Sequence, residues 1–123
     1  MALYRYWDDG NLEPSKALFA DSIEFYFSDG SEIKGSRDSA IATTQNFRNT
    51  FSAIKSTVHG IMPVKSIDKN ENWVCIWATE VTTTKAGKTD SMHLLETWRF
   101  NKDGKIDLLY QYSSVAAPPK KNK

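Results

Sequence analysis

Glu96 is the residue whose surroundings most clearly suggest chemistry. It stands in the stretch HLLETWRF, residues 93–100, which is typical of a β-strand. Because side chains alternate between the two faces of a strand, Glu96 shares its face with three apolar residues, Met92, Leu94 and Trp98. Such surroundings remove water from a carboxyl group, which favours its neutral form and raises its pKa. A neutral acid in a dry pocket can donate a hydrogen bond to a ligand or act as a general acid.

Two interpretations of Glu96 stay open. The residue could bind a ligand or transfer a proton, or it could be a structural acid whose partner is Gln111, a tyrosine hydroxyl or water. A partner of some kind is required, since burying a carboxyl group without one costs on the order of several kcal/mol. Gln111 lies two residues beyond Leu109 on the inward face of the last strand. Its amide could orient a ligand but could not abstract a proton.

The histidines and the cysteine are weaker candidates. Strand alternation places His93 on the face opposite Glu96, where we expect a surface or interface role. His59 could face either way in its strand, and a catalytic role is its less favoured interpretation. Two histidines without acids at ligand spacing do not predict a metal site. Cys75, in WVCIW, is expected to be a small buried hydrophobe and not a nucleophile.

Hydrophobic periodicity indicates the elements that position these residues. Short helices are predicted over residues 3–9 and 12–20, strands over 23–28 and 32–33, and a long helix over 37–51. Four strands follow, at 54–67, 72–84, 89–101 and 105–114, and the second of their turns is Lys85-Ala86-Gly87. This order predicts one α+β domain over residues 1–114, with helices on one face of a curved antiparallel sheet. The end AAPPKKNK, residues 116–123, has no core-forming residues, so we expect a disordered tail over residues 115–123.

Composition excludes several classes of partner. The 123 residues suit one domain, and a net charge of +1 removes the strongest indication of nucleic-acid binding. No apolar run approaches the roughly 20 residues that span a bilayer, and the start MALYRYWDDG lacks the apolar region of a signal peptide. We therefore expect a cytoplasmic protein that does not bind membranes, unless an export signal has been removed.

Three short motifs, in this order of elements, carry a resemblance to a known family. They are Gly-Asn-Leu at residues 10–12, Phe-Ala-Asp at 19–21 and Trp-Arg-Phe-x-x-x-Gly-Lys-Ile at 98–106. The chain resembles, over about residues 3–114, the SnoaL-like branch of the nuclear transport factor 2-like superfamily, which includes ketosteroid isomerases and polyketide cyclases. The resemblance implies a cystatin-like cone, in which the sheet wraps around the long helix and an open end forms a pocket. It also implies that the convex side of the sheet commonly pairs two copies.

The resemblance also suggests roles for single residues. Glu96 falls where ketosteroid isomerases carry the protonated acid of their oxyanion hole. The position of their general base is Phe27 here, and their oxyanion-hole tyrosine maps near Leu3, beside Tyr4 and Tyr6. Because Phe27 cannot act as a base, steroid isomerisation is not expected.

These observations define two surfaces. The expected ligand contacts inside the cone are Glu96, Gln111, Trp98, Trp77, Phe27, Tyr6 and Met92. The face expected to point outward is apolar, as homodimer interfaces are, and comprises Val74, Ile76, Ala78, Leu95, Leu108, Tyr110 and Tyr112.

Three functions remain open on this basis. The protein could be a homodimer that binds a small, largely apolar ligand, or a cofactor-free isomerase, cyclase or hydratase that uses Glu96 as its acid. It could also be a dimerisation or partner-docking module with a filled cone. A cavity of a few hundred Å³ around Glu96 would favour the first two.

Overall fold

Two short helical segments precede the sheet in the computed structural model, which describes residues 2–114. Helix α1 spans Ala2–Asp9 and the 3-10 helix η1 spans Glu13–Leu18, and the other helix is α2, Arg37–Arg48. The strands are β1 (Phe19–Tyr26), β2 (Glu32–Ser36), β3 (Phe51–Lys65), β4 (Asn72–Thr84), β5 (Thr89–Phe100) and β6 (Ile106–Ser114). The predicted α+β order is confirmed, and the tail predicted to be disordered lies outside the described residues. None of the helices within residues 2–114 is long and apolar enough to cross a membrane.

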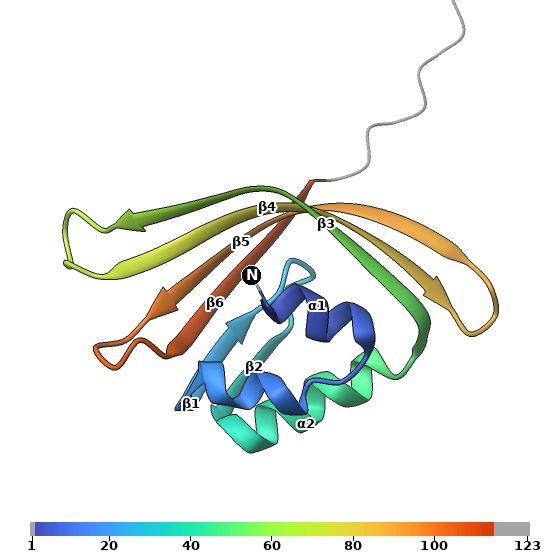
Figure 1. Cartoon of the computed structure of the whole chain (residues 1–123), viewed down its shortest axis with the longest axis horizontal. Coiled ribbons are helices and arrows are strands. Elements are labelled where there is room, and N and C mark those ends of the chain that lie inside the picture. The colour runs from blue at the N-terminus through green and yellow to red at the C-terminus, as the bar shows by residue number, and fades with distance from the viewer. Residues whose placement is uncertain (1, 115–123) are drawn as a thin grey trace, which may run out of the picture.

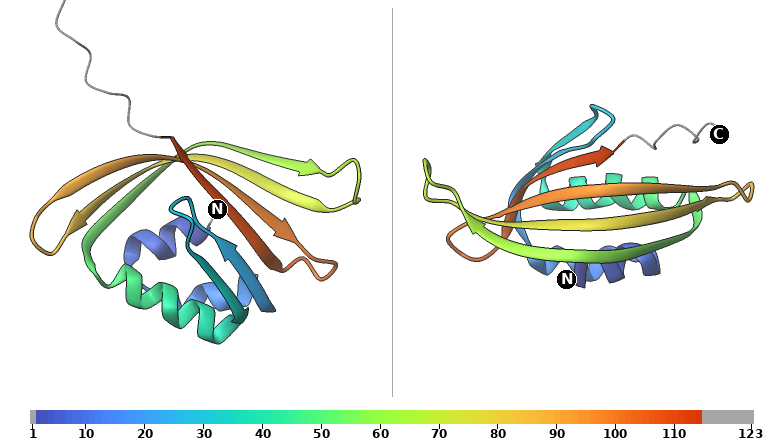
Figure 2. Two further views of the ribbon diagram at one scale, coloured as in Figure 1. Left: turned by 180° about the vertical axis from the view of Figure 1, so that it is seen from behind. Right: turned by 90° about the horizontal axis from the view of Figure 1, so that it is seen from above.

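The six strands form one curved sheet in the order β2-β1-β6-β5-β4-β3, with α1 and α2 beneath its concave face (Figure 1). All neighbours are antiparallel except β1 and β6, which are parallel, so the sheet is mixed and not purely antiparallel as predicted. The reason is topological: the chain enters the far edge at β3 and returns strand by strand until β6 reaches β1. Seen from behind, the β3–β4 turn and the β4–β5 turn extend past the helices on opposite sides (Figure 2).

The second predicted helix is the element that differs most. It is only a 3-10 segment of six residues with Pro14 in its first turn, and strand β1 already begins at Phe19. Phe19 and Ile23 are both buried from this strand, which joins the core of the sheet. Burial in the sheet therefore overrides the helical spacing of the apolar residues before it.

The core fills the space between the helices and the concave face of the sheet. Its buried members are Leu3, Leu12, Phe19, Ile23, Phe25, Ala40, Ile41, Ile76, Trp98, Ile106 and Leu109. The buried Arg48 of α2 fixes the end of α1, since its guanidinium donates to the carbonyl oxygens of Trp7 at 2.6 Å and Asp8 at 2.8 Å. The Asp8 carboxylate accepts from the backbone and hydroxyl of Ser56, at 2.8 and 2.7 Å. Polar contacts thus hold the C-terminal end of α1 against β3.

The two faces of strand β4 are the reverse of those predicted. Ile76 is the partner of Glu96 in the β4–β5 register, so both side chains lie on the concave face. Val74 and Ala78 share that face, and Ile76 is 0% exposed, so these three residues are not on the convex face as predicted. Trp77 points the other way and is 42% exposed, so it does not line the cone.

Candidate functional site

Glu96 lies on the concave face of β5, as predicted, and is 6% exposed. Its Oε1 accepts a hydrogen bond from the Tyr4 hydroxyl at 2.5 Å, and its Oε2 accepts from Nε2 of Gln111 at 2.9 Å. Each carboxylate oxygen therefore has one donor. The three side chains come from α1, β5 and β6, so only the folded chain brings them together.

Both partners of Glu96 have further contacts. Nε1 of Trp98 donates to the Tyr4 hydroxyl oxygen at 3.4 Å. Oε1 of Gln111 accepts from the backbone N–H and the hydroxyl of Ser28, at 3.3 and 3.4 Å. The result is a chain of polar contacts from Trp98 through Tyr4, Glu96 and Gln111 to Ser28, which orients the carboxyl group.

Burial controls the charge of this site. Loss of water raises the pKa of Glu96 above its ordinary value, and the hydrogen bonds from Tyr4 and Gln111 oppose that rise only in part. Burial, followed by the negative charge of Glu96, raises the pKa of Tyr4 as well. Tyr4 therefore stays a hydrogen-bond donor, while Glu96 keeps its proton to a higher pH than a surface glutamate. This arrangement can supply a proton or a strong hydrogen bond.

Glu80 is a second acid on the concave face, which the sequence did not identify. It lies opposite Met92 in the β4–β5 register, and its Oε2 accepts from Nε1 of Trp7 at 2.9 Å. Burial, the largest cause, raises the pKa of Glu80, the Trp7 hydrogen bond opposes the rise, and the charges of Glu96 and Asp8 add to it. Since Tyr4 and Trp7 are three residues apart on α1, one face of this helix provides a donor for each acid.

The other predicted contacts are distributed around this network. Phe27 packs against the core with its ring centroid 6.1 Å from that of Phe25. Met92 shares the face of Glu96 but is 37% exposed. Tyr6 does not reach Glu96: Tyr4 does, and the Tyr6 ring lies instead 5.5 Å from the guanidinium carbon of Arg5. The rotation of α1 decides which tyrosine enters the site.

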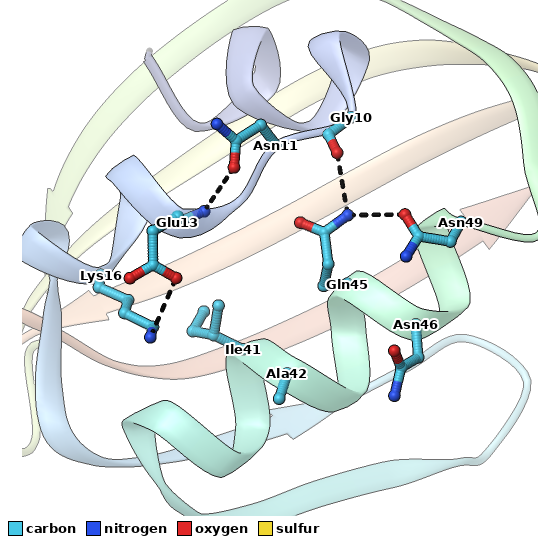
Figure 3. A pocket seen from close by; sticks show the side chains of 9 residues that line it. All are labelled: Gly10, Asn11, Glu13, Lys16, Ile41, Ala42, Gln45, Asn46 and Asn49. Carbon is cyan, nitrogen blue, oxygen red and sulfur yellow. Dashed lines mark hydrogen bonds and ion pairs between the residues drawn. The ribbon is translucent and has the colours of Figure 1, made fainter.

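Two of the hollows on the surface of residues 2–114 lie away from Glu96. One, of about 480 Å³, lies between the loop before η1 and helix α2, where Nε2 of Gln45 donates to the Gly10 carbonyl and to Oδ1 of Asn49 (Figure 3). The other, of about 540 Å³, lies between the start of β1 and the β5–β6 turn. Trp98, which shares the concave face of β5 with Glu96, packs its ring 6.3 Å from the Phe25 ring. The predicted cavity around Glu96 is thus neither of these hollows.

The convex face carries a row of exposed aromatic rings. Tyr110 stacks against Tyr26 with centroids 5.2 Å apart and against Trp73 at 6.0 Å, and Tyr112 is 59% exposed. Leu95 faces this side as predicted, because it pairs with Tyr112 across β5 and β6. Leu108 also pairs on this side but is already buried within the chain.

Solved structures of other proteins share this architecture. A protein with a cystatin-like fold from Caulobacter vibrioides superposes with a TM-score of 0.76 at 14% identity, covering 94% of this chain and 84% of that one. A putative dehydratase of the NTF2-like family from Streptomyces avermitilis gives 0.72 at 12% identity, covering 94% and 91%. A protein with a ketosteroid isomerase-like fold from Catenulispora acidiphila, in complex with trimethylamine, gives 0.72 at 15% identity, covering 94% and 84%. These identities establish the cone fold alone.

The sequence itself identifies the family. No curated protein matches the chain. The SnoaL-like domain, in contrast, matches residues 1–108, which include Tyr4, Glu80 and Glu96. The chain therefore belongs to the SnoaL-like domain family.

Proposed function

We propose that this protein binds a small, largely apolar molecule on the concave side of its sheet, with Glu96 as the polar contact that orients it. The observation that carries the proposal is the buried carboxyl group held by Tyr4 and Gln111. A carboxyl group that keeps its proton in apolar surroundings is an efficient donor to a ligand carbonyl or hydroxyl oxygen. The proposed ligand is accordingly an apolar molecule that carries at least one such oxygen.

The ligand gains access by displacing part of α1. Within Ala2–Asp9 only Leu3 is fully buried, and an eight-residue helix has little stability of its own. The contacts of Arg48 and Asp8 hold its C-terminal end, whereas Tyr4 lies nearer its N-terminal end. A ligand oxygen that takes the place of the Tyr4 hydroxyl would meet Glu96 without disturbing those contacts.

Native mass spectrometry of the untagged protein purified from its source tests this function. We expect an additional mass corresponding to a co-purified molecule in the wild type and in Glu24→Gln, a control on an exposed acid of β1. We expect its occupancy to fall at least tenfold in Glu96→Gln, which removes the acidic proton but keeps the shape. Equal occupancy in all three proteins would remove Glu96 from the binding site.

A catalytic role is the second candidate, and Glu80 is the observation that favours it. Two acids with raised pKa values on one concave face could divide the roles of proton donor and proton acceptor. The similarity in fold to a putative dehydratase is compatible with such proton transfers. If the protein is an enzyme, Glu80→Gln will still bind the co-purified molecule but will no longer convert it. Conversion at the wild-type rate in this variant would exclude Glu80 from catalysis.

We also propose that two copies associate through the convex face. The exposed row of Trp77, Tyr110 and Tyr112 is an apolar surface of the kind that marks interfaces. Within this row, Tyr110 stacks against Tyr26 and Trp73.

Sedimentation velocity at micromolar concentration tests the dimer. We expect a dimer for the wild type and for Ile67→Lys, a control in the β3–β4 turn, and a monomer for Tyr112→Lys. A monomeric wild type would contradict the proposal. A dimer without any co-purified molecule would instead favour the docking module, in which aromatic rings fill the cone.

A further inference from the structure

The two histidines of the chain, which the sequence separates by 34 positions, meet on the convex face. Nε2 of His59 lies 2.6 Å from the hydroxyl oxygen of Thr79, and Nδ1 of His93 lies 3.1 Å from the same oxygen. The three residues come from the neighbouring strands β3, β4 and β5. One ring nitrogen of each imidazole is therefore directed toward a common point above the middle strand.

A backbone irregularity places His59 there. Val58 pairs with Ala78 and Gly60 pairs with Trp77, so His59 is an extra residue in β3 that has no partner in β4. Such a β-bulge redirects the side chain of the extra residue, and bulges are frequent beside functional sites. His93 reaches the same hydroxyl from a regular position, since it is the partner of Thr79 in the β4–β5 register.

We propose that His59 and His93 form a binding site for a divalent transition-metal ion of the Zn²⁺ class. Neutral imidazole nitrogen is a preferred ligand of Zn²⁺, with bonds of about 2.0–2.1 Å. Both rings are exposed, so a small rotation of each ring toward the other costs little free energy. Because both rings contact the Thr79 hydroxyl, one nitrogen of each ring lies on the same side of the pair. Water completes the coordination. Residues 2–114 contain no cluster of three or more His, Cys, Asp and Glu that could hold a metal, so the site consists of this pair.

The surroundings do not oppose a cation. Along β4 the convex neighbours of Thr79 are Trp77 and Val81, and along β5 those of His93 are Ser91 and Leu95, all of which are neutral. Lys55 lies further along β3, opposite Val81.

Isothermal titration calorimetry of the untagged full chain with ZnCl₂ tests the site. At pH 7.5 we expect one Zn²⁺ ion per chain, and a loss of affinity of about tenfold or more in His59→Gln and in His93→Gln, since each removes one of two protein ligands. Lys55→Gln should bind like the wild type, because Lys55 lies on the same face of β3 but provides no ligand.

Absence of saturable binding by the wild type would overturn the proposal. So would wild-type affinity in either histidine variant. Both substitutions are on exposed side chains, so circular dichroism should show an unchanged fold, and neither result depends on the ligand proposed for the cone.

Discussion

Tyr4→Phe is the substitution that examines the Glu96 network most closely. It keeps the aromatic ring in place and removes only the hydroxyl group, which donates to Glu96 at 2.5 Å and accepts from Trp98 at 3.4 Å. A hydrogen bond to a neutral partner contributes about 0.5–1.5 kcal/mol, and one to a charged partner about 1.5–3 kcal/mol. The loss in stability should therefore depend on whether Glu96 is protonated.

The sign of the pH dependence follows from the folded-state pKa. The pKa of Glu96 is raised above its ordinary value of 4.5, so the folded protein loses stability relative to the unfolded chain as the pH rises from 4.5 through the raised value. The Tyr4 hydrogen bond lowers the pKa of Glu96, and its removal raises that pKa further. The destabilisation caused by Tyr4→Phe should accordingly grow with pH, from about 0.5–1.5 kcal/mol where Glu96 is protonated toward about 1.5–3 kcal/mol where it is ionised.

Urea unfolding followed by tryptophan fluorescence at pH 5, 6.5 and 8, at one protein concentration, measures this difference. Tyr6→Phe is the matched control, because the Tyr6 hydroxyl has no hydrogen-bond partner within residues 2–114, and we expect a change within about 0.5 kcal/mol. In a Glu96→Gln background the pH dependence of Tyr4→Phe should disappear. A destabilisation that is equal at pH 5 and 8, or that falls with pH, would refute the assignment of Tyr4 as the donor to a buried acid.

Two further substitutions test the charge of Glu96 and the contacts of Arg48 with the C-terminal end of α1. Glu96→Gln removes the group that is harder to ionise when folded, so the variant should gain stability relative to the wild type above pH 4.5, by at most about 1.4 kcal/mol per pH unit. Urea unfolding across pH 5 to 8 checks this, and a relative loss that increases with pH would contradict it. Gly10 has a φ of +82°, which an alanine adopts only with strain, and the added Cβ of Gly10→Ala would lie 3.3 Å from Nη2 of Arg48. We therefore expect the free energy of unfolding to fall by about 1–2 kcal/mol. That loss should lower the melting temperature by about 4–8 °C per kcal/mol in calorimetry, whereas an unchanged value would show that α1 and Arg48 adapt freely.

Strand alternation was sufficient to predict which residues of β5 and β6 share the face of Glu96. On β5 a polar residue stands within an apolar stripe, and on β6 Leu109 and Gln111 stand on one side, so each strand has two unlike faces. Gln111, one of the three partners that the sequence left open for Glu96, lies opposite it in the β5–β6 register and donates to it at 2.9 Å.

Strand β4 could not be oriented in this way, because both of its faces are apolar. Trp73, Cys75 and Trp77 alternate with Val74 and Ile76, so hydrophobicity alone does not choose a side. The turn between β4 and β5 determines the orientation. Lys85-Ala86-Gly87 joins Thr84 to Lys88, and the Thr84 N–H donates to the Lys88 carbonyl at 2.8 Å. In the register that continues from this pair, Ile76 lies opposite Glu96. Counting back from that turn would have placed Glu80 inside the cone and Trp77 outside it.

Other features depend on geometry that the sequence does not reveal locally. A rotation of α1 by two residues separates Tyr4 from Tyr6, and the helix has too few buried residues for its pattern to define that rotation. The bulge at His59 and the parallel pairing of β1 with β6 arise from contacts between distant segments. These long-range contacts create the histidine pair and complete the sheet.

Carbon-13 NMR titration of the glutamate side-chain carboxyl groups, with Glu96→Gln to assign the signal, is the most direct measurement of the state of the buried acid. We predict that the Glu96 carboxyl titrates above its ordinary value of 4.5. If Glu96 titrates at or below 4.5, the carboxyl group is in contact with water and cannot act as the proton-bearing contact of an apolar ligand.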